Sequence, residues 1–435
     1  MADLSPVFGA GVVPLSSAHF SQGIDELVEA LADDETLLLI QDLDGVCMGL
    51  VRDPLTRVLE RRYLLAAREL HGHFFVLTNG EHIGRRGVNR LVEAAAGGVD
   101  AARDGRLYLP GLGGGGVQLQ DARGFVTHPG ISREELDFLA GVPARLQARL
   151  HEILIAKPFN FSAPEARKLV EVCVLDNAVS PTLNLNPLYE ALGERSDEYR
   201  LAQSAARGFL EAELDAAADA CLGDAFFLHF APNRGRDELG VEIVKEASHD
   251  DPGTTDFQFM LRGAVKEAGV LVLLNRYYGQ HFGLFPLGED FSVRDAPADR
   301  AALVDLAADR FDAAVMPRIV GVGDTVTSIL DRPTAARGGS DRGFLQLVQD
   351  LGQTFGTNNL TVFVDSSGGE VRRPGVRGDL CMSDGDTRWD AVAGISDRHD
   401  PLRLNYAFRG GHRQYVDFFC ELAARRTQRA DPGRA

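Results

Sequence analysis

The chain has 435 residues, of which 45% are hydrophobic and 25% are charged. This composition is typical of a folded globular protein and excludes disorder as the main state, and the length predicts two or three domains, or one domain with a large insertion. The 45 basic and 63 acidic residues give a net charge of −18, which excludes general binding to nucleic acid or to an anionic membrane, because both require basic patches.

The cysteines and the apolar runs predict a cytoplasmic location. The five cysteines are odd in number and far apart and form no C-x-x-C pair, which favours free thiols in a reducing compartment. The N-terminus shows no signal peptide, and the longest apolar run, at residues 270–274, is far shorter than a membrane span. We therefore expect neither a nucleic-acid partner nor a membrane partner.

The first part of the chain alternates short apolar runs with stretches of helical spacing, which predicts an α/β domain. The expected elements are helices at 24–31 and 55–70, strands at 37–40 and 74–77, and a strand that begins at 107–109 and ends in the glycine cluster 111–116.

The pattern changes from about residue 124. Long helical stretches are expected at 134–155, 164–172 and 197–221, followed by strand-like segments at 225–230, 241–244, 270–274 and 282–285. After residue 290 the earlier pattern returns, with a helix at 297–311, strands at 318–322 and 360–364, and a closing helix at 414–426. We interpret this as one core, residues 1–122 and 291–435, interrupted by an inserted domain at 123–290.

Reactive side chains follow three of the predicted strands. Asp42 and Asp44 follow the first, Thr78 the second, and Asp324 a later one. Ligand sites in open α/β sheets form beyond the carboxyl ends of the strands, and Gly45 permits a tight turn beside the two carboxylates. Asp42 could act as a nucleophile or metal ligand and Asp44 as a general acid/base. An isolated D-x-D-G often only caps a helix or binds a cation, but the ordered set is more specific.

These three segments resemble the motifs of the haloacid dehalogenase-like phosphohydrolases. They are LLLIQDLDGVC (37–47), HFFVLTNG (73–80) and RIVGVGDTVTS (318–328). The resemblance implies a Rossmann-like parallel-sheet core with a large α/β cap inserted between the second and third motifs. It also implies a phosphomonoesterase that works through an aspartyl-phosphate.

The resemblance assigns a role to each motif residue. Asp42 would attack phosphorus, and Asp44 would protonate the leaving alcohol and then activate water. Thr78, followed by Asn79, would bind the phosphoryl oxygens. Asp42, the carbonyl of Asp44 and Asp324 would hold Mg²⁺, a cation that suits an all-oxygen site.

The sequence departs from the superfamily pattern at two places. The fourth motif normally has a second acid four residues after Asp324, where this chain has Ser328. Thr325, Ser328 itself or a water would have to substitute, and Asp331 is the nearest spare acid.

The basic residue of the third motif has two candidates. Arg294, just before the helix expected at 297–311, fits best, and Lys245 is its competitor. Either could instead be an ordinary surface charge.

Four longer stretches, at 39–55, 76–84, 275–297 and 316–330, are similar to one family within this superfamily, the glucosylglycerol-3-phosphate phosphatases. That similarity implies hydrolysis of glucosylglycerol 3-phosphate in osmolyte synthesis and salt tolerance. It further implies association with the synthase that makes the glycoside phosphate. Polar cap residues that could contact this substrate are Asn275, Arg276, Tyr277 and His281.

Three alternatives stay open at this point. The substrate could be another sugar phosphate, of the trehalose, sucrose or mannosylglycerate type. The chain could be a metal-dependent glycosyltransferase, although this would leave Thr78 and Asp324 without roles. It could also be a catalytically silent binding protein, if the serine at position 328 abolishes metal binding.

Overall fold

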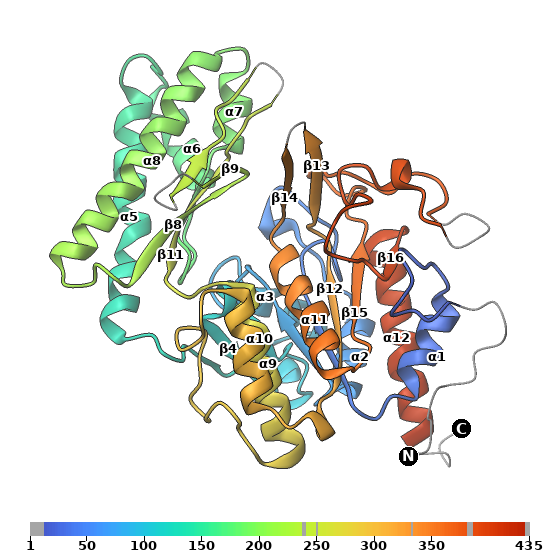
Figure 1. Ribbon diagram of the computed structural model, residues 1–435. Helices are drawn as coiled ribbons and strands as arrows, with labels where there is room; N and C mark the ends of the chain where they lie inside the picture. Colours follow the sequence, from blue (N-terminus) through green and yellow to red (C-terminus); the bar gives the residue numbers. More distant parts are fainter. Residues whose placement is uncertain (1–12, 237–240, 249–250, 332–333, 381–385, 431–435) are drawn as a thin grey trace. The chain divides into compact units, whose positions relative to one another are not determined.

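The computed structural model describes residues 13–236, 241–248, 251–331, 334–380 and 386–430 (Figure 1). The chain forms two compact units. The first contains the described residues of Met1–His82, Gly87–Pro129 and Val265–Ala435, and the second contains those of Ile83–Arg86 and Gly130–Ala264. Among the described residues, no helix is long and apolar enough to cross a membrane.

The first unit is built on an eight-stranded sheet with the strand order β16-β15-β12-β1-β2-β3-β4-β5. Its strands are β1 (Leu37–Gln41), β2 (Phe74–Leu77), β3 (Gly111–Gly113), β4 (Gln118–Gln120), β5 (Val126–Thr127), β12 (Arg318–Gly323), β15 (Leu360–Val364) and β16 (Tyr406–Phe408). Neighbouring strands from β16 to β3 are parallel, whereas β4 and β5 pair antiparallel. In the central register, Leu39 lies opposite Val320 on one side and Phe74 on the other.

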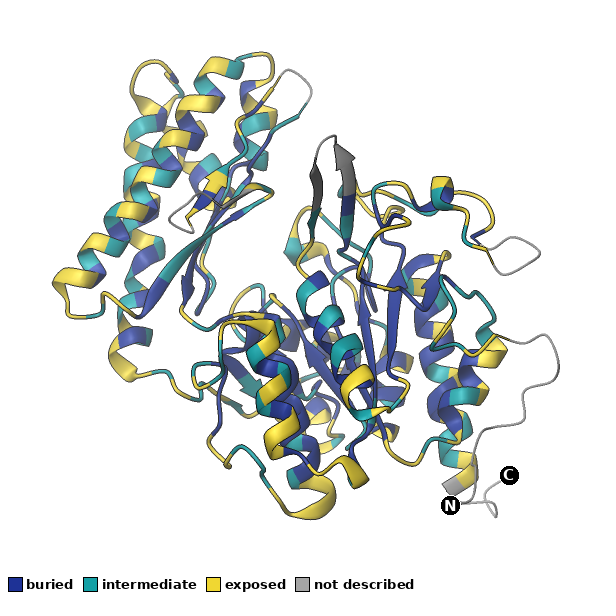
Figure 2. Ribbon diagram, viewed as in Figure 1, coloured by how far each residue is buried: buried dark blue, intermediate teal, exposed yellow. Residues whose placement is uncertain are grey.

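Both faces of this sheet are covered, so its central strands are buried along their whole length (Figure 2). The side chains of Leu37 and Leu39 join the cluster formed with α1 (Ile24–Ala32), α2 (Arg61–Glu69) and α12 (Gly411–Ala430). Uninterrupted apolar runs are characteristic of parallel strands that are buried on both faces. The sequence therefore predicted these strands well.

Three helices pack together on the opposite face of the sheet. They are α9 (Lys266–Phe282), α10 (Arg300–Arg310) and α11 (Arg342–Phe355). Gly321 of β12 permits a close approach there, because a Cβ at this position would lie 3.0 Å from the side chain of Leu345. The α/β core with a parallel sheet that the sequence predicted is therefore confirmed.

Shorter elements complete the first unit. They are α3 (Val88–Ala96), α4 (Val99–Asp104), the 3₁₀ turns η1 (Pro54–Thr56), η2 (Gly114–Gly116), η3 (Ala313–Val315) and η4 (Trp389–Val392), and the hairpin β13 (Thr327–Asp331) and β14 (Thr334–Gly338). The hairpin follows β12 directly and pairs antiparallel from Thr327 opposite Gly338 to Asp331 opposite Thr334.

The second unit is a separate α/β layer. Its four-stranded sheet has the order β6-β7-β11-β8, and β9 and β10 form a two-stranded ribbon. The strands are β6 (Val174–Leu175), β7 (Thr182–Asn184), β8 (Phe226–Ala231), β9 (Asn233–Arg236), β10 (Glu242–Val244) and β11 (Asp256–Leu261), and the helices are α5 (Arg133–Ile155), α6 (Ala163–Cys173), α7 (Asn186–Leu192) and α8 (Ser196–Asp219). Capping boxes at Ser132 and Ser162 fix where α5 and α6 begin.

The strands expected at 270–274 and 282–285 are wrong, because residues 266–282 form the helix α9 and residues 283–285 belong to no strand. This helix belongs to the first unit and packs against β1, β2 and β3. The second unit accordingly ends at Ala264, before the predicted boundary at residue 290. The residues proposed for substrate contact in 275–281 therefore lie on a core helix, where Asn275 and Tyr277 are buried.

Candidate active site

The ends of three adjacent parallel strands carry Asp42, Asp324 and Thr78. Asp42 follows β1, Asp324 follows the neighbouring β12, and Thr78 follows β2 on the other side of β1. The backbone N–H of Asp42 donates to the carbonyl of Val322 at 2.9 Å, which continues the β1–β12 pairing up to the carboxylate. The carboxyl edge of the sheet thus gathers the motif residues.

A buried lysine lies beside Asp42. The Nζ of Lys266 is 2.7 Å from Asp42 Oδ2 and 2.7 Å from Asp341 Oδ1, and the Lys266 side chain is only 2% exposed. Lys266 is the first residue of α9, and the start of this helix lies beside the carboxyl end of β1, where Asp42 is. The other Asp42 oxygen accepts the N–H of Leu43 at 2.7 Å. These contacts hold the Asp42 carboxylate in one orientation.

Asp341 joins the cluster from the N-cap position of α11. Its Oδ2 accepts the backbone N–H groups of Asp324 and Thr325, both at 2.9 Å, while its Oδ1 accepts from Lys266. Oxygens of Asp42, Asp324 and Asp341 all lie within 4.8 Å of one another. Asp341 is therefore the third acid of this cluster, 17 residues after Asp324.

The electrostatics of this cluster favour a bound cation. Burial and the charge of Asp341 together raise the pKa of Asp42 to about 7, although Lys266 opposes them. Burial and the charges of Asp341 and Asp42 raise the pKa of Asp324 well above its usual value. Burial disfavours the charged form of Lys266, but Asp341 and Asp42 outweigh it and raise the pKa of the ammonium.

The donor set fits a divalent cation. Three ionised carboxylates with one ammonium leave two negative charges in a buried site, which is expensive unless they are balanced. Among the described residues, Asp324 Oδ2 is buried without a hydrogen-bond partner. Both oxygens of Asp341 and both oxygens of Asp42 already accept hydrogen bonds, so Asp324 Oδ2 is the carboxylate oxygen of the cluster that is left open to a cation. An all-oxygen set of this kind suits Mg²⁺.

Gly45 allows the chain to pass next to Asp324 in the acidic cluster. Its φ is +81°, and a Cβ at this position would lie 2.1 Å from Asp324 Oδ2. Only glycine therefore lets the backbone that follows Asp44 approach the unpartnered oxygen of Asp324.

Asp44 faces a second group of residues. Arg57 donates through Nη1 to Asp44 Oδ2 at 2.9 Å, and the Arg57 side chain is 6% exposed while that of Asp44 is 30% exposed. Thr78 Oγ1 accepts the N–H of Gly80 at 3.1 Å. A Cβ placed on Gly80 would lie 3.4 Å from Thr78 Oγ1, 3.6 Å from Asp44 Oδ2 and 3.8 Å from Arg57 Nη1. A hydroxyl, a carboxylate and a guanidinium thus surround one small space.

The two predicted bases do not make the contact expected of the third motif. Lys266 fills the position beside Asp42 instead. Arg294 lies in the loop between α9 and α10, and Lys245 belongs to the second unit, where it pairs with Asp251. Asn79 is exposed in the turn after Thr78.

Ser328 is not a ligand of the cluster. It is buried in β13, and its hydroxyl donates to Asp397. Thr325 donates its hydroxyl to Asp324 Oδ1 at 2.9 Å. The side chain of Asp331, named as a spare acid, lies outside the described part of the structure.

Three residues of the site were missed in the sequence. Lys266 begins a helix that was taken for a strand; its signal was a rare lysine before a long apolar run. Asp341 precedes an amphipathic stretch, 342–355, and an acid at that point is an ordinary helix-start signal. For Arg57 the sequence carries no signal.

Comparison with known proteins identifies relatives over nearly the whole chain. The sequence model of the glucosylglycerol-phosphate phosphatase family matches residues 36–423. A glucosylglycerol-phosphate phosphatase from Synechocystis sp. is 48% identical over 417 residues, which cover 95% of this chain and 98% of that protein.

Solved structures give only distant likenesses. The trehalose-6-phosphate phosphatase of Aspergillus fumigatus has a TM-score of 0.38 at 7% identity, with 93% of this chain and 99% of that chain covered. The C-terminal domain of the Candida albicans trehalose-6-phosphate phosphatase has a TM-score of 0.41 at 10% identity, with the same coverage.

Proposed function

Because the chain belongs to the glucosylglycerol-phosphate phosphatase family, we propose that it hydrolyses glucosylglycerol 3-phosphate to glucosylglycerol and phosphate. The single observation that carries the proposed chemistry is the buried Asp42 carboxylate, held by Lys266 next to Asp324 and Asp341. Hydrolysis of phosphate monoesters is among the slowest uncatalysed reactions, so a nucleophile and local charge neutralisation are both needed.

The reaction proceeds in two steps. An oxygen of Asp42 attacks phosphorus, the bond to the glucosylglycerol oxygen breaks, and Asp44 gives that oxygen its proton. Asp44 then removes a proton from a water that attacks the aspartyl-phosphate, which releases phosphate and restores Asp42. Dividing the hydrolysis through a covalent intermediate replaces one difficult step with two easier ones.

The remaining residues bind and orient. Thr78 donates its hydroxyl to a phosphoryl oxygen, with Asn79 beside it in the same turn. Lys266 keeps the Asp42 carboxylate aligned for attack and stabilises negative charge near it. Arg57 orients the Asp44 carboxyl group. We propose Lys266 as the base of the third motif, in place of Arg294 or Lys245.

Mg²⁺ is the proposed cofactor. Asp42 and Asp324 would hold it, with the carbonyl of Asp44, and Asp341 would orient Asp324 through the backbone N–H that it accepts. The cation would neutralise charge on the phosphoryl oxygens. The unpartnered Asp324 Oδ2 and the proximity of the three carboxylates support this assignment.

The second unit is proposed to act as the cap that recognises the glucosylglycerol group. Its residues 130–264 are inserted in the chain between Thr78 and Lys266, so this unit can vary without changing the phosphoryl-transfer residues. The four cysteines that the structure describes, Cys47, Cys173, Cys221 and Cys420, are free, which supports a reducing cytoplasm. Association with the synthase that forms the substrate is part of the same proposal.

The test is phosphate release from a substrate panel by the purified chain with Mg²⁺. We expect the highest kcat/KM for glucosylglycerol 3-phosphate, with trehalose, sucrose and mannosylglycerate phosphates as competitors. Preference for one of these would transfer the assignment to that substrate. Turnover of a sugar nucleotide without phosphate release would instead indicate a glycosyltransferase.

Asp42→Asn tests the covalent route in the same assay. The variant keeps the shape of the side chain but removes the nucleophile, so we expect kcat to fall by about 10³-fold or more with an unchanged circular dichroism spectrum. Normal turnover by this variant would exclude the aspartyl-phosphate mechanism.

A further inference from the structure

The β13–β14 hairpin begins and ends at the cation cluster. The chain leaves the cluster at Asp324, forms the hairpin, and returns at Asp341. At the base, the N–H of Asp341 donates to the carbonyl of Thr325 at 3.1 Å, while Asp341 Oδ2 accepts the N–H groups of Asp324 and Thr325. The distance between the two acids therefore depends on how the two legs of the hairpin are held.

Asp397 contacts both strands of the hairpin. It accepts the hydroxyl of Ser328 on β13, and it accepts Arg337 Nη2 on β14 at 3.0 and 3.1 Å. The backbone reinforces this attachment, because Ser328 N–H donates to the carbonyl of Gly394 at 3.1 Å. One carboxylate thus joins neighbouring residues of the hairpin, since Ser328 and Arg337 are paired in the ladder.

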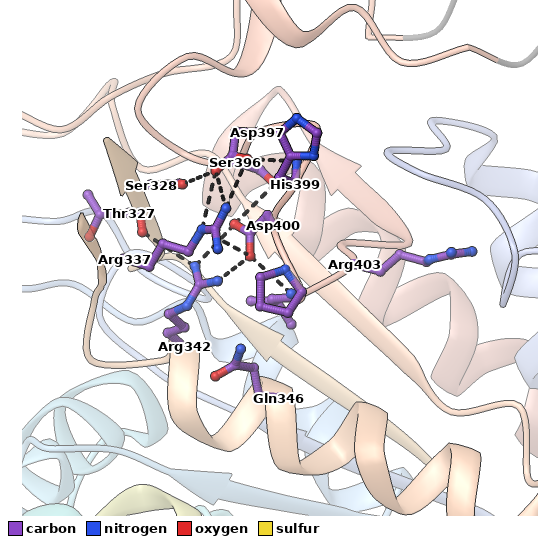
Figure 3. Close-up of polar contacts among 12 residues, drawn as sticks. Thr327, Ser328, Arg337, Arg342, Gln346, Ser396, Asp397, His399, Asp400 and Arg403 are labelled. Carbon is purple, nitrogen blue, oxygen red and sulfur yellow. Dashed lines mark hydrogen bonds and ion pairs between the residues drawn. The ribbon is translucent and has the colours of Figure 1, made fainter. Parts of the chain in front are cut away.

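Asp400 makes the second attachment, to the residue that follows Asp341. Arg342 donates to both oxygens of Asp400, with Nη1 at 3.2 Å from Oδ2, and Nη1 also lies 3.4 Å from the carbonyl of Thr327. Arg337 Nε is 4.0 Å from Asp400 Oδ1. Figure 3 shows the two arginines reaching from the hairpin and from α11 toward Asp397 and Asp400.

This network is buried and balanced in charge. The side chains of Asp400, Asp397 and Arg342 are 1%, 6% and 8% exposed, and two arginines face two aspartates. Although burial opposes ionisation, the Ser328 hydroxyl, the N–H of His399 and Arg337 lower the pKa of Asp397. Bidentate arginine–carboxylate pairs fix geometry as well as charge. The network is therefore suited to hold the hairpin in one position.

We propose that Asp397 and Asp400 are positioning residues that clamp the hairpin and α11, and so set the spacing of Asp324 and Asp341 on which cation affinity depends. This inference rests on the proposed function, because it assumes that the acidic cluster holds a divalent cation. It adds a role for the segment 386–405, which contributes no residue to the reaction itself. Supporting contacts around ligand residues commonly change metal affinity by about 10- to 100-fold.

The test measures Mn²⁺ binding to the full-length chain by titration calorimetry, after removal of divalent cations and without substrate. We expect Asp397→Asn and Asp400→Asn each to weaken Mn²⁺ binding by about tenfold. Because the defect is in cation affinity, excess Mg²⁺ should restore most of the turnover. Ser328→Ala, which removes one contact of the clamp and disturbs the fold least, should weaken binding by a smaller factor.

Glu213→Gln is the matched control. Glu213 is fully buried in the second unit and paired with Arg145 Nε at 2.8 Å, so its loss perturbs a buried charge in the unit that does not contain the hairpin. We expect this variant to lower the melting temperature as Asp397→Asn does, but to leave Mn²⁺ affinity unchanged.

The outcomes separate the inference from the proposed function. If the unaltered chain binds Mn²⁺ and the clamp variants, Ser328→Ala included, bind it equally well, the clamp is overturned and the proposed function stands. If Glu213→Gln weakens Mn²⁺ binding as much as Asp397→Asn, the effect is general destabilisation and the clamp is again overturned. If the unaltered chain binds no divalent cation, the clamp falls together with the proposed cation site.

Discussion

At the scale of single residues, the ammonium of Lys266 lies between two buried carboxylates, and its loss would leave both without their counter-charge. We expect Lys266→Met to lower the free energy of unfolding by about 3–5 kcal/mol in the absence of divalent cations. Turnover should fall by about 100-fold or more, because a donor aligned with the nucleophile is lost. Urea unfolding and steady-state kinetics measure the two effects.

Lys245→Met is the control for this change. Lys245 is 39% exposed and pairs with Asp251, so its loss should cost no more than about 1 kcal/mol and leave kcat near that of the unaltered chain. A larger loss of kcat in Lys245→Met than in Lys266→Met would restore the original assignment of the third-motif base.

The contact between Arg57 and Asp44 predicts a dependence on the leaving group. General acid catalysis matters for an alkoxide leaving group and hardly at all for p-nitrophenolate. We expect Arg57→Gln to lower kcat by about tenfold or more with the glycoside phosphate, and by less than about threefold with p-nitrophenyl phosphate. Equal losses with both substrates would mean that Arg57 acts on the phosphoryl group and not through Asp44.

The sequence predicted those residues of the candidate site that directly follow strands. Asp42, Asp44, Thr78 and Asp324 could be named because the carboxyl ends of parallel strands meet at one edge. Lys266 was not named, because it reaches the same edge from the start of a helix, and the apolar run that follows it was read as a strand. Contacts such as Arg57 with Asp44 arise only from the path of the folded chain.

At the scale of elements, Gly45 lets the loop after β1 pass against Asp324. We expect Gly45→Ala to lower the free energy of unfolding by about 1 kcal/mol through its positive φ, and to reduce turnover sharply by displacing Asp324. Denaturant unfolding and kcat at saturating Mg²⁺ report these two consequences separately.

Gly356→Ala provides the comparison. Gly356 also has a positive φ, +69°, at the C-cap of α11, but nothing lies within 4 Å of an added Cβ. We therefore expect Gly356→Ala to lower the free energy of unfolding by a similar amount and to leave turnover normal. If Gly45→Ala retained normal turnover as well, the close contact with Asp324 would have no catalytic importance.

The elements that the sequence misassigned share one physical cause. In α9, residues 268–274 are buried on every side, so their apolar side chains show no helical period. A short, uniformly apolar run cannot be distinguished from a buried strand by periodicity alone. By contrast α5 and α8 are partly exposed, and their alternation of apolar and polar residues was sufficient to predict them.

At the scale of the whole molecule, His82 makes stability depend on pH. Burial lowers the pKa of His82 to about 4, against a weaker opposite effect of the Gly111 carbonyl. The unfolded chain binds a proton near pH 6.5, whereas the folded chain does not until about pH 4. The free energy of unfolding is therefore not reduced by His82 above pH 6.5. It falls as the pH decreases toward 4, by roughly 3 kcal/mol in total.

Urea unfolding at several pH values, with His82→Gln, measures this contribution. The variant should lose roughly that much of the acid sensitivity between pH 6.5 and 4. His71→Gln is the control, because it removes an imidazole that is exposed to solvent. An unaltered profile in His82→Gln would show that the buried imidazole is protonated at little cost in the folded chain.

The two-unit structure and the candidate site account for the length and the net charge of the chain. The residues beyond a single core form the inserted second unit, so the chain is two units and not a row of independent domains. The excess of acidic residues is consistent with a substrate phosphate only if positive charge is local. Lys266, Arg57 and a bound cation would supply it at the carboxyl edge of the sheet.

Because a hairpin joins Asp324 and Asp341, the number of residues between these acids can change without moving them apart in space. Its strands pair in register from Thr327 opposite Gly338, so a residue added to each strand would lengthen the hairpin outward and leave its base where it is. Homologues could therefore differ here by pairs of residues and keep the same site, although a search for acids at a fixed interval would miss them. The same property makes the hairpin a place where a peptide tag or reporter could be inserted while both acids stay in place.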